Sequence, residues 1–317
     1  MRWLITGGCG FIGTNLIARL GAEGGQAIRV YDDLSVGSEA ALALAAPGPG
    51  AVELVVGDVL DAERLARAAE DADIVVHLAA NTEIPRSIAD PHTDCRVNVL
   101  GTLNVLAAAR RAAAGCFVFA SSVAPLGDVA PPVHEGLAPR PMSPYGASKL
   151  AGEGYCSAYA HSFGLATVAL RFGNVYGPRS SHKGSVVAKF IRAALAGEPL
   201  TVHGDGGQTR DFIYVDDLVR AVVLAAHAPG LAGELFQIAT ARETAVTELV
   251  AALLPALDAA GVRRPEVRHE AERTGEMRRN YADTTRARTR LGWSAEVALD
   301  EGLRRTVAWF VARRGSA

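Results

Sequence analysis

The chain has 317 residues, of which 49% are hydrophobic and 21% charged, and its formal net charge is −2 at pH 7. This composition supplies enough apolar material for a large core in one or two domains, and it lacks the basic excess that marks proteins binding nucleic acid or anionic membranes. The four cysteines lack paired metal-ligand spacing, which argues against a disulfide framework and a metal site. The sequence shows neither a signal-peptide pattern nor a run of about 18 apolar residues, which argues against secretion and a membrane span. We therefore expect a cytoplasmic protein.

Short apolar runs alternate with amphipathic stretches along the first half of the chain, which indicates βαβ units and a parallel sheet. Strands are predicted at residues 3–6, 27–31, 52–56, 74–78, 117–120 and 167–171. Helices are predicted at residues 12–20, 62–69, 98–113 and 147–163, and the alanine-rich residues 42–51 are predicted as a surface loop. Six strands joined by crossovers predict an α/β fold with a Rossmann-type, doubly wound parallel sheet.

The rest of the chain carries more Pro, Gly and Arg, although a predicted helix at 216–226 and a predicted strand at 235–238 continue the α/β pattern. We therefore predict a Rossmann domain formed by residues 1–171 and about 212–242. A smaller, interleaved substrate lobe is predicted from residues 172–211 and 243–317, without a flexible linker between the two.

A glycine-rich loop directly follows the first predicted strand and opens the first predicted helix. Its sequence is Thr6-Gly7-Gly8-Cys9-Gly10-Phe11-Ile12-Gly13. Glycines at positions 7, 10 and 13 permit a tight turn and the close approach of a pyrophosphate, which the unpaired amides of a helix N-terminus can bind. Asp32 lies 19 residues after Gly13, where its carboxylate can accept hydrogen bonds from ribose hydroxyls and would repel a 2′-phosphate. The loop therefore predicts binding of NAD, in preference to NADP.

A tyrosine and a lysine stand four residues apart, Tyr145 and Lys149, and so share one face of a helix that begins near Tyr145. A phenol is a poor base at neutral pH, but a neighbouring ammonium and the positive nicotinamide ring favour the phenolate. Tyr145 is thus predicted to exchange a proton with a substrate hydroxyl. Ser122 follows the strand at 117–120, where its hydroxyl can bridge substrate and Tyr145, or where a serine pair can form a simple turn.

These motifs, in this order, resemble the NAD-dependent epimerase/dehydratase branch of the extended short-chain dehydrogenases/reductases, and the resemblance covers nearly the whole chain. Besides the glycine loop, Ser121-Ser122 and the Tyr145/Lys149 pair, it is carried by Asp32-Asp33-Leu34, Gly57-Asp58-Val59, His77-Leu78-Ala79-Ala80, Asn98 in Val97-Asn98-Val99-Leu100-Gly101-Thr102, Arg171-Phe172-Gly173-Asn174-Val175-Tyr176-Gly177-Pro178, His203-Gly204-Asp205-Gly206, Gln208-Thr209-Arg210-Asp211-Phe212-Ile213-Tyr214-Val215-Asp216-Asp217 and Arg273-Thr274-Gly275-Glu276.

The resemblance implies roles for individual residues. The cofactor contacts that it implies are Gly7, Gly10, Phe11, Ile12, Gly13, Asp32, Asp58, Val59, Leu78, Ala79, Ala80, Asn98, Lys149 and Phe172. It further implies that Asn174, Arg210 and Arg273 hold the diphosphate of a UDP-sugar, to which guanidinium groups are suited, and that Thr201 and His203 enclose the base. Alternatively, the two arginines form exposed salt bridges and His203 lies in a surface turn.

The chain departs from the family pattern just after Ser122, where it reads Val123-Ala124-Pro125-Leu126 and lacks a tyrosine of the sugar pocket. Dehydratases of the family carry an Asp-Glu pair after this serine position and decarboxylases a Glu, whereas valine and alanine cannot transfer protons. We therefore predict NAD-dependent 4-epimerisation of a UDP-hexose through a 4-keto intermediate. A dehydratase, decarboxylase or reductase is the alternative, and a non-catalytic NAD-sensing protein is a remote one.

Two finer expectations follow from the resemblance. UDP-hexose epimerases use the position seven residues after Arg273 to narrow the sugar pocket with a bulky aromatic; Asn280 stands there, which predicts room for UDP-N-acetylglucosamine as well as UDP-glucose. Family members commonly form homodimers through a four-helix bundle. The small-residue, apolar faces of the predicted helices at 98–113 and 147–163 suit such a homodimer, although the same faces can also pack on the sheet.

Overall fold

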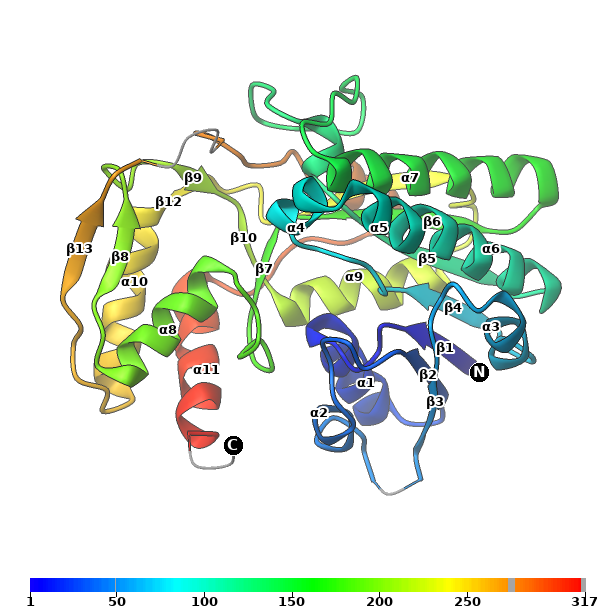
Figure 1. Ribbon diagram of the computed structural model, residues 1–317, viewed down its shortest axis with the longest axis horizontal. Coiled ribbons are helices and arrows are strands. Elements are labelled where there is room, and N and C mark those ends of the chain that lie inside the picture. The colour runs from blue at the N-terminus through cyan, green and yellow to red at the C-terminus, as the bar shows by residue number, and fades with distance from the viewer. Residues whose placement is uncertain (49, 273–276, 315–317) are drawn as a thin grey trace.

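A seven-stranded parallel sheet forms the centre of the computed structural model, which describes residues 1–48, 50–272 and 277–314 (Figure 1). Its strands lie in the order β11-β6-β5-β4-β1-β2-β3, with bounds β1 (Arg2–Thr6), β2 (Ala27–Asp32), β3 (Val52–Val56), β4 (Ile74–His77), β5 (Cys116–Ser122), β6 (Thr167–Phe172) and β11 (Glu234–Ile238). The strand order reverses between β1 and β4, and ligands of such sheets bind in the crevice outside the carboxyl ends of the strands at this point. The predicted Rossmann-type fold is confirmed.

Helices cover both faces of the sheet. One face is covered by α1 (Phe11–Glu23) and α9 (Val215–His227), and the other by α3 (Ala62–Ala68), α6 (Gly101–Arg111) and α7 (Pro144–Phe163). Successive residues of one strand enter opposite layers: Ile5 packs in the cluster that includes α1 and α9, whereas Leu4 packs in the cluster that includes α3, α6 and α7. Because both faces are buried, the strands are continuous apolar runs in the sequence, and this pattern predicts them.

The predicted helix at 98–113 is the main departure from the sequence analysis. The chain here folds into α4 (Ile84–Ala89), α5 (Pro91–Cys95), the π-helix η1 (Arg96–Leu100) and then α6, so helical structure begins earlier and its hydrogen-bond pattern changes around Asn98. Pro85 and Pro91 stand in the first turns of α4 and α5, where a missing amide is tolerated. π-helical turns are often found at functional sites.

The predicted surface loop at 42–51 was placed too early. Residues 42 and 43 belong to the short helix α2 (Glu39–Ala43), because the Ser38 hydroxyl accepts a hydrogen bond from the amide of Ala41 and caps the helix. Leu42 is buried in the core beside α1. The described residues after Ala43 are turns and bends.

A second hydrophobic cluster forms the smaller lobe, on the left of Figure 1. Its elements are α8 (Val186–Ala196), β8 (Leu200–His203), β9 (Thr209–Arg210), β12 (Thr244–Ala245), α10 (Val246–Ala259), β13 (Val267–Glu270) and α11 (Leu299–Ala312). The short strands β7 (Asn174–Tyr176) and β10 (Phe212–Tyr214) pair with each other. The predicted division at residues 171 and 212 runs through this small sheet, where the chain passes from one half of the molecule to the other.

The remaining short elements are the 3₁₀ turn η2 (Ala124–Leu126) after β5 and the π-helix η3 (Ala287–Leu291). No helix within residues 1–48, 50–272 and 277–314 combines the length and the apolarity that a bilayer crossing needs.

Candidate active site

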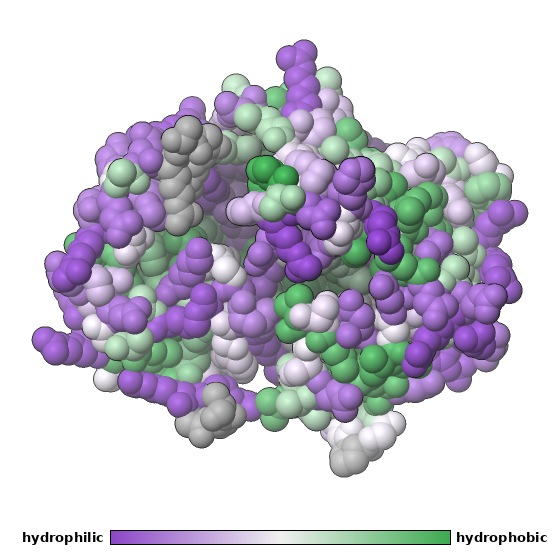
Figure 2. All heavy atoms as spheres, in the orientation of Figure 1, coloured by the Kyte–Doolittle hydropathy of each residue, from purple (hydrophilic) through white to green (hydrophobic). Residues whose placement is uncertain are grey.

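A cleft of about 900 Å³ runs between the sheet and the smaller lobe (Figure 2). Nineteen of the predicted site residues line it: Gly7, Gly10, Phe11, Ile12, Gly13, Asp32, Asp58, Val59, Leu78, Ala79, Ala80, Ser122, Tyr145, Lys149, Phe172, Asn174, Thr201, His203 and Arg210. Asn98 and Asn280 lie outside this lining, and Arg273 lies outside the described residues. Segments far apart in the sequence therefore meet in one cleft.

The glycine loop between β1 and α1 is shaped for a close ligand. Gly7 has a φ of +69°, and a Cβ there would lie 2.6 Å from the amide nitrogen of Ala79. A Cβ at Gly13 would lie 2.5 Å from the Cα of Gly8. The N-cap of α1 is Gly10, which has no side chain to bind the first-turn amides, so these amides can donate to a phosphate. The loop thus fits the pyrophosphate of a dinucleotide.

Asp32 places a carboxylate at the end of β2, beside the glycine loop. Its Oδ2 accepts a hydrogen bond from the amide of Cys9 at 2.9 Å, and its Oδ1 accepts one from the amide of Leu34 at 2.8 Å. Burial raises the pKa of this carboxyl, while the two backbone hydrogen bonds oppose the rise. Each oxygen keeps further acceptor capacity, which suits the two hydroxyls of an adenosine ribose.

A buried chain of hydrogen bonds ties the ends of β1 and β4 to the segment that follows η1. Thr102 Oγ1 donates to the carbonyl of Asn98 at 2.6 Å, so the contact of 2.9 Å between His77 Nε2 and Thr102 Oγ1 is donated by the histidine. His77 Nδ1 then accepts from Thr6 Oγ1 at 2.7 Å. Burial lowers the pKa of His77 to about 3, which keeps the ring neutral in this role.

Asn98 holds the loop after β4 and does not itself face the cleft. Its Oδ1 accepts from the amide of Asn81 at 2.8 Å, and its Nδ2 lies within hydrogen-bond distance of the Asn81 carbonyl, Asp94 Oδ1 and Ser148 Oγ. Residues 79–82, which line the cleft, are therefore fixed from behind. Asn98 therefore acts on the cofactor site indirectly, by holding the residues that line it.

The predicted catalytic group lies where β5 ends and α7 begins. Ser143 caps α7 by accepting from the amide of Gly146, and Pro144 stands in the first turn, so Tyr145 and Lys149 lie one helical turn apart. Lys149 Nζ donates to the carbonyl of Ala120 at 2.8 Å and lies 6.0 Å from the centroid of the Tyr145 ring. The hydroxyl of Ser122 lies close enough to the phenol of Tyr145 to lower the pKa of that phenol.

Burial dominates the acid–base properties of this group. It raises the pKa of Tyr145 to about 12, against which the Ser122 hydrogen bond acts, and it lowers the pKa of Lys149 to about 8. Each value describes the protein without a dinucleotide. A positive charge placed beside the phenol would lower its pKa, so a bound NAD⁺ and a protonated Lys149 both favour the base form of Tyr145.

A buried ion pair supports the end of β5 from behind. Glu153, one turn after Lys149, accepts from Arg171 Nε at 2.8 Å and Nη2 at 2.7 Å, and its Oε1 also accepts from the hydroxyl of Ser121. Both charged side chains are under 10% exposed. The pair joins α7 to β5 and β6, and so fixes the helix that carries Tyr145 against the strand that carries Ser122.

The far end of the cleft is built by the smaller lobe. Arg210 Nη1 donates to the carbonyls of Thr209 and Met277, which directs the guanidinium along the cleft wall. Asn280 is buried beside this wall, where its Nδ2 contacts Met277 Sδ at 3.1 Å. Thr201 and His203 come from β8, the strand that borders the cleft in this lobe.

Comparisons with known proteins place the chain in a family. The sequence profile described as "NAD dependent epimerase/dehydratase family" matches residues 3–239, and the UDP-glucose 4-epimerase of Mycolicibacterium smegmatis is 39% identical over 315 residues, covering 98% of both chains. The chain belongs to the NAD-dependent epimerase/dehydratase family. The prediction of an NAD-dependent enzyme of this family is thereby confirmed.

Solved structures of family members have the same fold. The UDP-N-acetylglucosamine 4-epimerase of Methanobrevibacter ruminantium, in complex with UDP-N-acetylmuramic acid, is 30% identical with a TM-score of 0.90. The UDP-glucose 4-epimerase of Thermotoga maritima, with UDP-glucose, is 35% identical with a TM-score of 0.89. In both cases 98% of each chain is covered.

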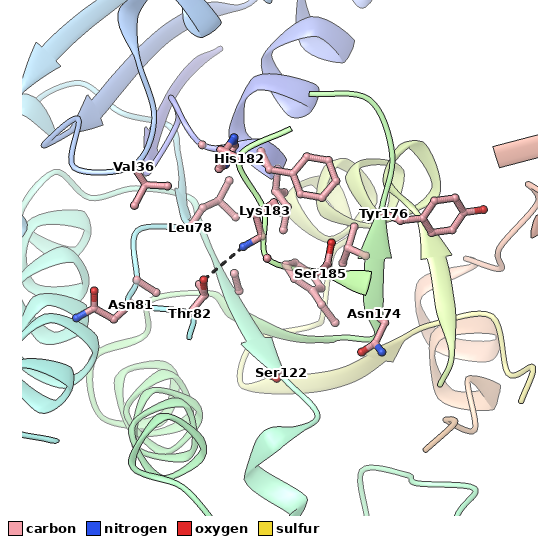
Figure 3. A pocket seen from close by; sticks show the side chains of 18 of the residues that line it. Val36, Leu78, Asn81, Thr82, Ser122, Asn174, Tyr176, His182, Lys183 and Ser185 are labelled. Atoms are coloured by element: carbon pink, nitrogen blue, oxygen red, sulfur yellow. Dashed lines mark hydrogen bonds between the residues drawn. The ribbon is translucent and has the colours of Figure 1, made fainter. Parts of the chain in front are cut away.

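A cationic loop that reaches into the cleft of this family enzyme was not predicted from the sequence. Lys183 extends from the loop between β7 and α8 toward Thr82, with 3.4 Å between Nζ and Oγ1, while Ser122 and Asn174 lie further along the pocket (Figure 3). Arg192 of α8 donates to the carbonyls of residues 181 and 183 and so holds this loop. The signal in the sequence was a polar Ser-Ser-His-Lys-Gly stretch between two ordered elements.

Proposed function

We propose that this enzyme inverts the C4 hydroxyl of a UDP-linked hexose. The observation that carries the proposal is the convergence of Ser122, Tyr145 and Lys149 where the glycine loop faces the smaller lobe. The relatives described above, which align over nearly their full length, include UDP-glucose 4-epimerases. The proposed substrate is UDP-glucose or UDP-galactose, and it extends to their N-acetylated counterparts.

The proposed mechanism uses Tyr145 as the base. The phenolate takes the proton of the C4 hydroxyl, with the Ser122 hydroxyl bridging the two oxygens, and protonated Lys149 stabilises the phenolate. A bound NAD would supply the reversible hydride chemistry at C4, and the residues of the glycine loop and Asp32 would hold it there. Between oxidation and re-reduction at C4 the 4-keto sugar turns about its diphosphate linkage while Arg210 and Arg273 hold the nucleotide, so the opposite face of C4 is presented. Tyr145 then returns the proton, and no net oxidation occurs.

The residues that follow Ser122 favour epimerisation over elimination or decarboxylation. Val123 and the residues of η2 (Ala124–Leu126) carry no titratable side chain, so the keto intermediate meets no additional acid or base from this segment. The proposal is tested by incubating the enzyme with UDP-[4-²H]glucose and analysing products by NMR. Deuterium retained at C4 of UDP-galactose supports it, whereas a 4-keto-6-deoxy sugar, CO₂ or stoichiometric consumption of reduced cofactor contradicts it.

The breadth of sugar specificity is proposed from Asn280. In the structure this side chain is buried against Met277 and does not line the cleft, so it leaves the space that an aromatic side chain would reduce. Turnover of UDP-glucose and UDP-N-acetylglucosamine by one preparation tests this point. Activity on the plain hexose with none on the N-acetylated sugar would contradict the proposed wide pocket.

Replacing Tyr145 tests the catalytic assignment. Tyr145→Phe removes the ionisable hydroxyl and keeps the ring, so we expect kcat to fall by at least about 100-fold with unchanged circular dichroism and NAD content. Tyr155→Phe, on the same helix but 39% exposed, is the matched control and should retain activity. Epimerisation at a near-normal rate by Tyr145→Phe would refute the base assignment.

We further propose that the enzyme is a cytoplasmic homodimer. The four cysteines are unpaired, which suits a reducing compartment. The outer faces of η1 and α7 expose Leu100, Tyr155 and Phe163, of which 39–50% is accessible, and such apolar side chains suit a helix-to-helix contact with a second copy.

A further inference from the structure

Asp94 is a buried carboxyl group behind the catalytic pair that the mechanism above does not use. It lies on α5, which packs against α7, and only 2% of it is exposed. Its Oδ1 accepts from Asn98 Nδ2 at 2.9 Å. Its Oδ2 is buried and has no hydrogen-bond partner among the described residues. An ionised carboxyl in such a place requires a nearby positive charge.

The charged groups around Lys149 are few and can be taken in turn. Glu153 is committed to Arg171 by two short hydrogen bonds, so that pair carries no net charge. His77 is neutral because burial lowers its pKa to about 3, and burial likewise raises the pKa of the Cys156 thiol. Among the negative groups that raise the pKa of this lysine, Asp94 acts most strongly, ahead of Cys156 and Glu153.

We infer that Asp94 is a positioning residue that acts as the buried counter-charge of Lys149 and keeps this lysine protonated beside Tyr145. The inference rests on the proposed role of the Tyr145–Lys149 pair and adds the group that sets its charge. Burial alone pushes Lys149 toward the neutral amine, and its pKa of about 8 leaves little margin above neutral pH. The attraction of Asp94 opposes this effect. Burial raises the pKa of Asp94, and the hydroxyl of Ser148 and then the charge of Lys149 lower it against that effect.

Asp94 also acts on Tyr145 directly, and in the opposite sense. As a negative charge, the Asp94 carboxylate raises the pKa of the phenol. Removing Asp94 would therefore favour the phenolate of Tyr145 directly, but would disfavour it indirectly by making Lys149 lose its proton more easily. A change in rate alone therefore cannot decide the matter. The ionisation of Lys149 itself has to be measured.

The chain offers a direct measurement because it contains only three lysines, Lys149, Lys183 and Lys189. Protein grown with [ε-¹³C]lysine gives three signals whose shifts follow ionisation, and the signal lost in Lys149→Arg identifies Lys149. The test variant is Asp94→Asn, which removes the charge, keeps an oxygen for Asn98 and replaces the oxygen that has no partner. Asp90→Asn is the matched control, since Asp90 caps the exposed start of the same helix.

We expect the titration midpoint of Lys149 to fall by about 1 pH unit in Asp94→Asn, a tenfold loss of proton affinity, and to stay unchanged in Asp90→Asn. Asp94→Glu should restore the midpoint, and Asp94→Ser serves as the second neutral variant if the amide does not fold. An unchanged midpoint in the neutral variants overturns the inference even if activity is lost. A lowered midpoint with normal epimerisation supports the counter-charge and instead contradicts the catalytic role proposed for Lys149.

Discussion

Lys149 lies in an environment that suits catalysis and works against stability. Burial lowers its pKa from 10.5 to about 8, so between these two pH values the unfolded chain binds more protons than the folded one. Stability therefore rises with pH across this window, and the burial penalty is fully present below about pH 8. A difference of 2.5 in pKa corresponds to about 3 kcal/mol.

This linkage predicts the behaviour of Lys149→Met. The variant is expected to be inactive and to lack the pH-dependent contribution, so the free energy of unfolding of the wild type should gain about 3 kcal/mol on that of the variant between pH 7.5 and pH 10.5. Urea unfolding at steps of pH measures it, with the exposed Lys189→Met as control. A difference between wild type and Lys149→Met that stays constant over this range would contradict the prediction.

Single residues of the site could be predicted from the sequence where their spacing carries information. The interval between Tyr145 and Lys149 places both on one helical face, and the glycines of the first loop stand where the backbone requires them. Asp94 could not be found in this way, because its importance depends on contacts between α5 and α7 that local spacing does not encode. Lys183 could not be predicted for a similar reason, because the position of a loop side chain depends on the segment that it contacts in the folded chain.

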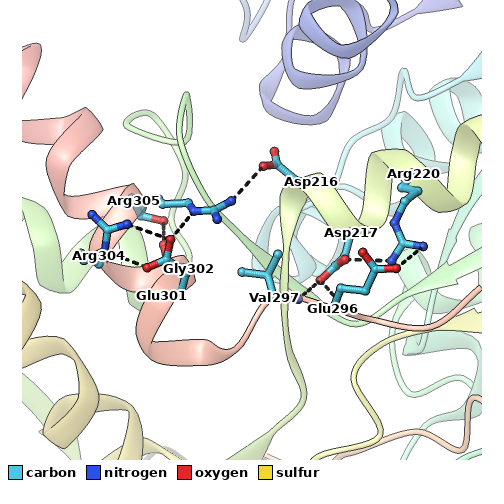
Figure 4. Close-up of polar contacts among 10 residues, drawn as sticks. Asp216, Asp217, Arg220, Glu296, Val297, Glu301, Gly302, Arg304 and Arg305 are labelled. Carbon is cyan, nitrogen blue, oxygen red and sulfur yellow. Dashed lines mark hydrogen bonds and ion pairs between the residues drawn. The ribbon is translucent and has the colours of Figure 1, made fainter. Parts of the chain in front are cut away.

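Two neighbouring aspartates at the start of α9 show how an element is held in place (Figure 4). Asp217 is buried, and its Oδ2 accepts from the amides of Glu296 and Val297, which lead into α11. Asp216 is half-exposed, and its ion pair with Arg305 is long, at 3.8 Å. The first therefore fixes the approach to α11, whereas the second contributes little.

The pair predicts contrasting effects of one substitution at adjacent positions. Asp217→Asn replaces one acceptor oxygen by an NH2 donor, which then faces either the amides of Glu296 and Val297 or the guanidinium of Arg220. We therefore expect a loss of about 2–3 kcal/mol in the free energy of unfolding. Asp216→Asn should cost less than about 1 kcal/mol. Chemical denaturation of both variants measures the contrast, and equal losses would show that the buried hydrogen bonds do not hold the two elements together.

Elements of the sheet were easier to predict than the segment before α6. Strands buried on both faces are short apolar runs, and the predicted strands 52–56 and 167–171 differ from β3 and β6 by at most one residue. The predicted helix at 98–113 lacked its first turns because α4 and α5 are too short to show a helical period. The π-helix η1 depends on tertiary contacts of Asn98, which hydrophobic periodicity cannot report.

At the scale of the whole molecule, the chain passes repeatedly between its two halves. After β6 it builds β7 and α8, returns through β10 to α9 and β11, and then completes the smaller lobe. The cleft residues predicted for the cofactor come from the sheet domain. Thr201, His203 and Arg210 come from the segment of the smaller lobe between β7 and β10. This interleaving explains why composition gave no sharp domain boundary.

The exposed flank of the sheet domain predicts the assembly of the enzyme. Leu100 and Tyr155 lie on the outward faces of η1 and α7, and hydrophobic side chains are visible on the flank over α5 and α6 in Figure 2. In a two-fold interface each substitution occurs twice, so Leu100→Lys combined with Tyr155→Lys brings four ammonium groups into the proposed contact. We expect sedimentation to give twice the chain mass of 33.1 kDa for the wild type and the single mass for the variant. Leu44→Lys changes a similarly exposed leucine directly after α2, which packs in the α1 layer on the other face of the sheet, and it should leave the dimer intact. A wild type that sediments as a monomer at micromolar concentration would refute the proposed homodimer.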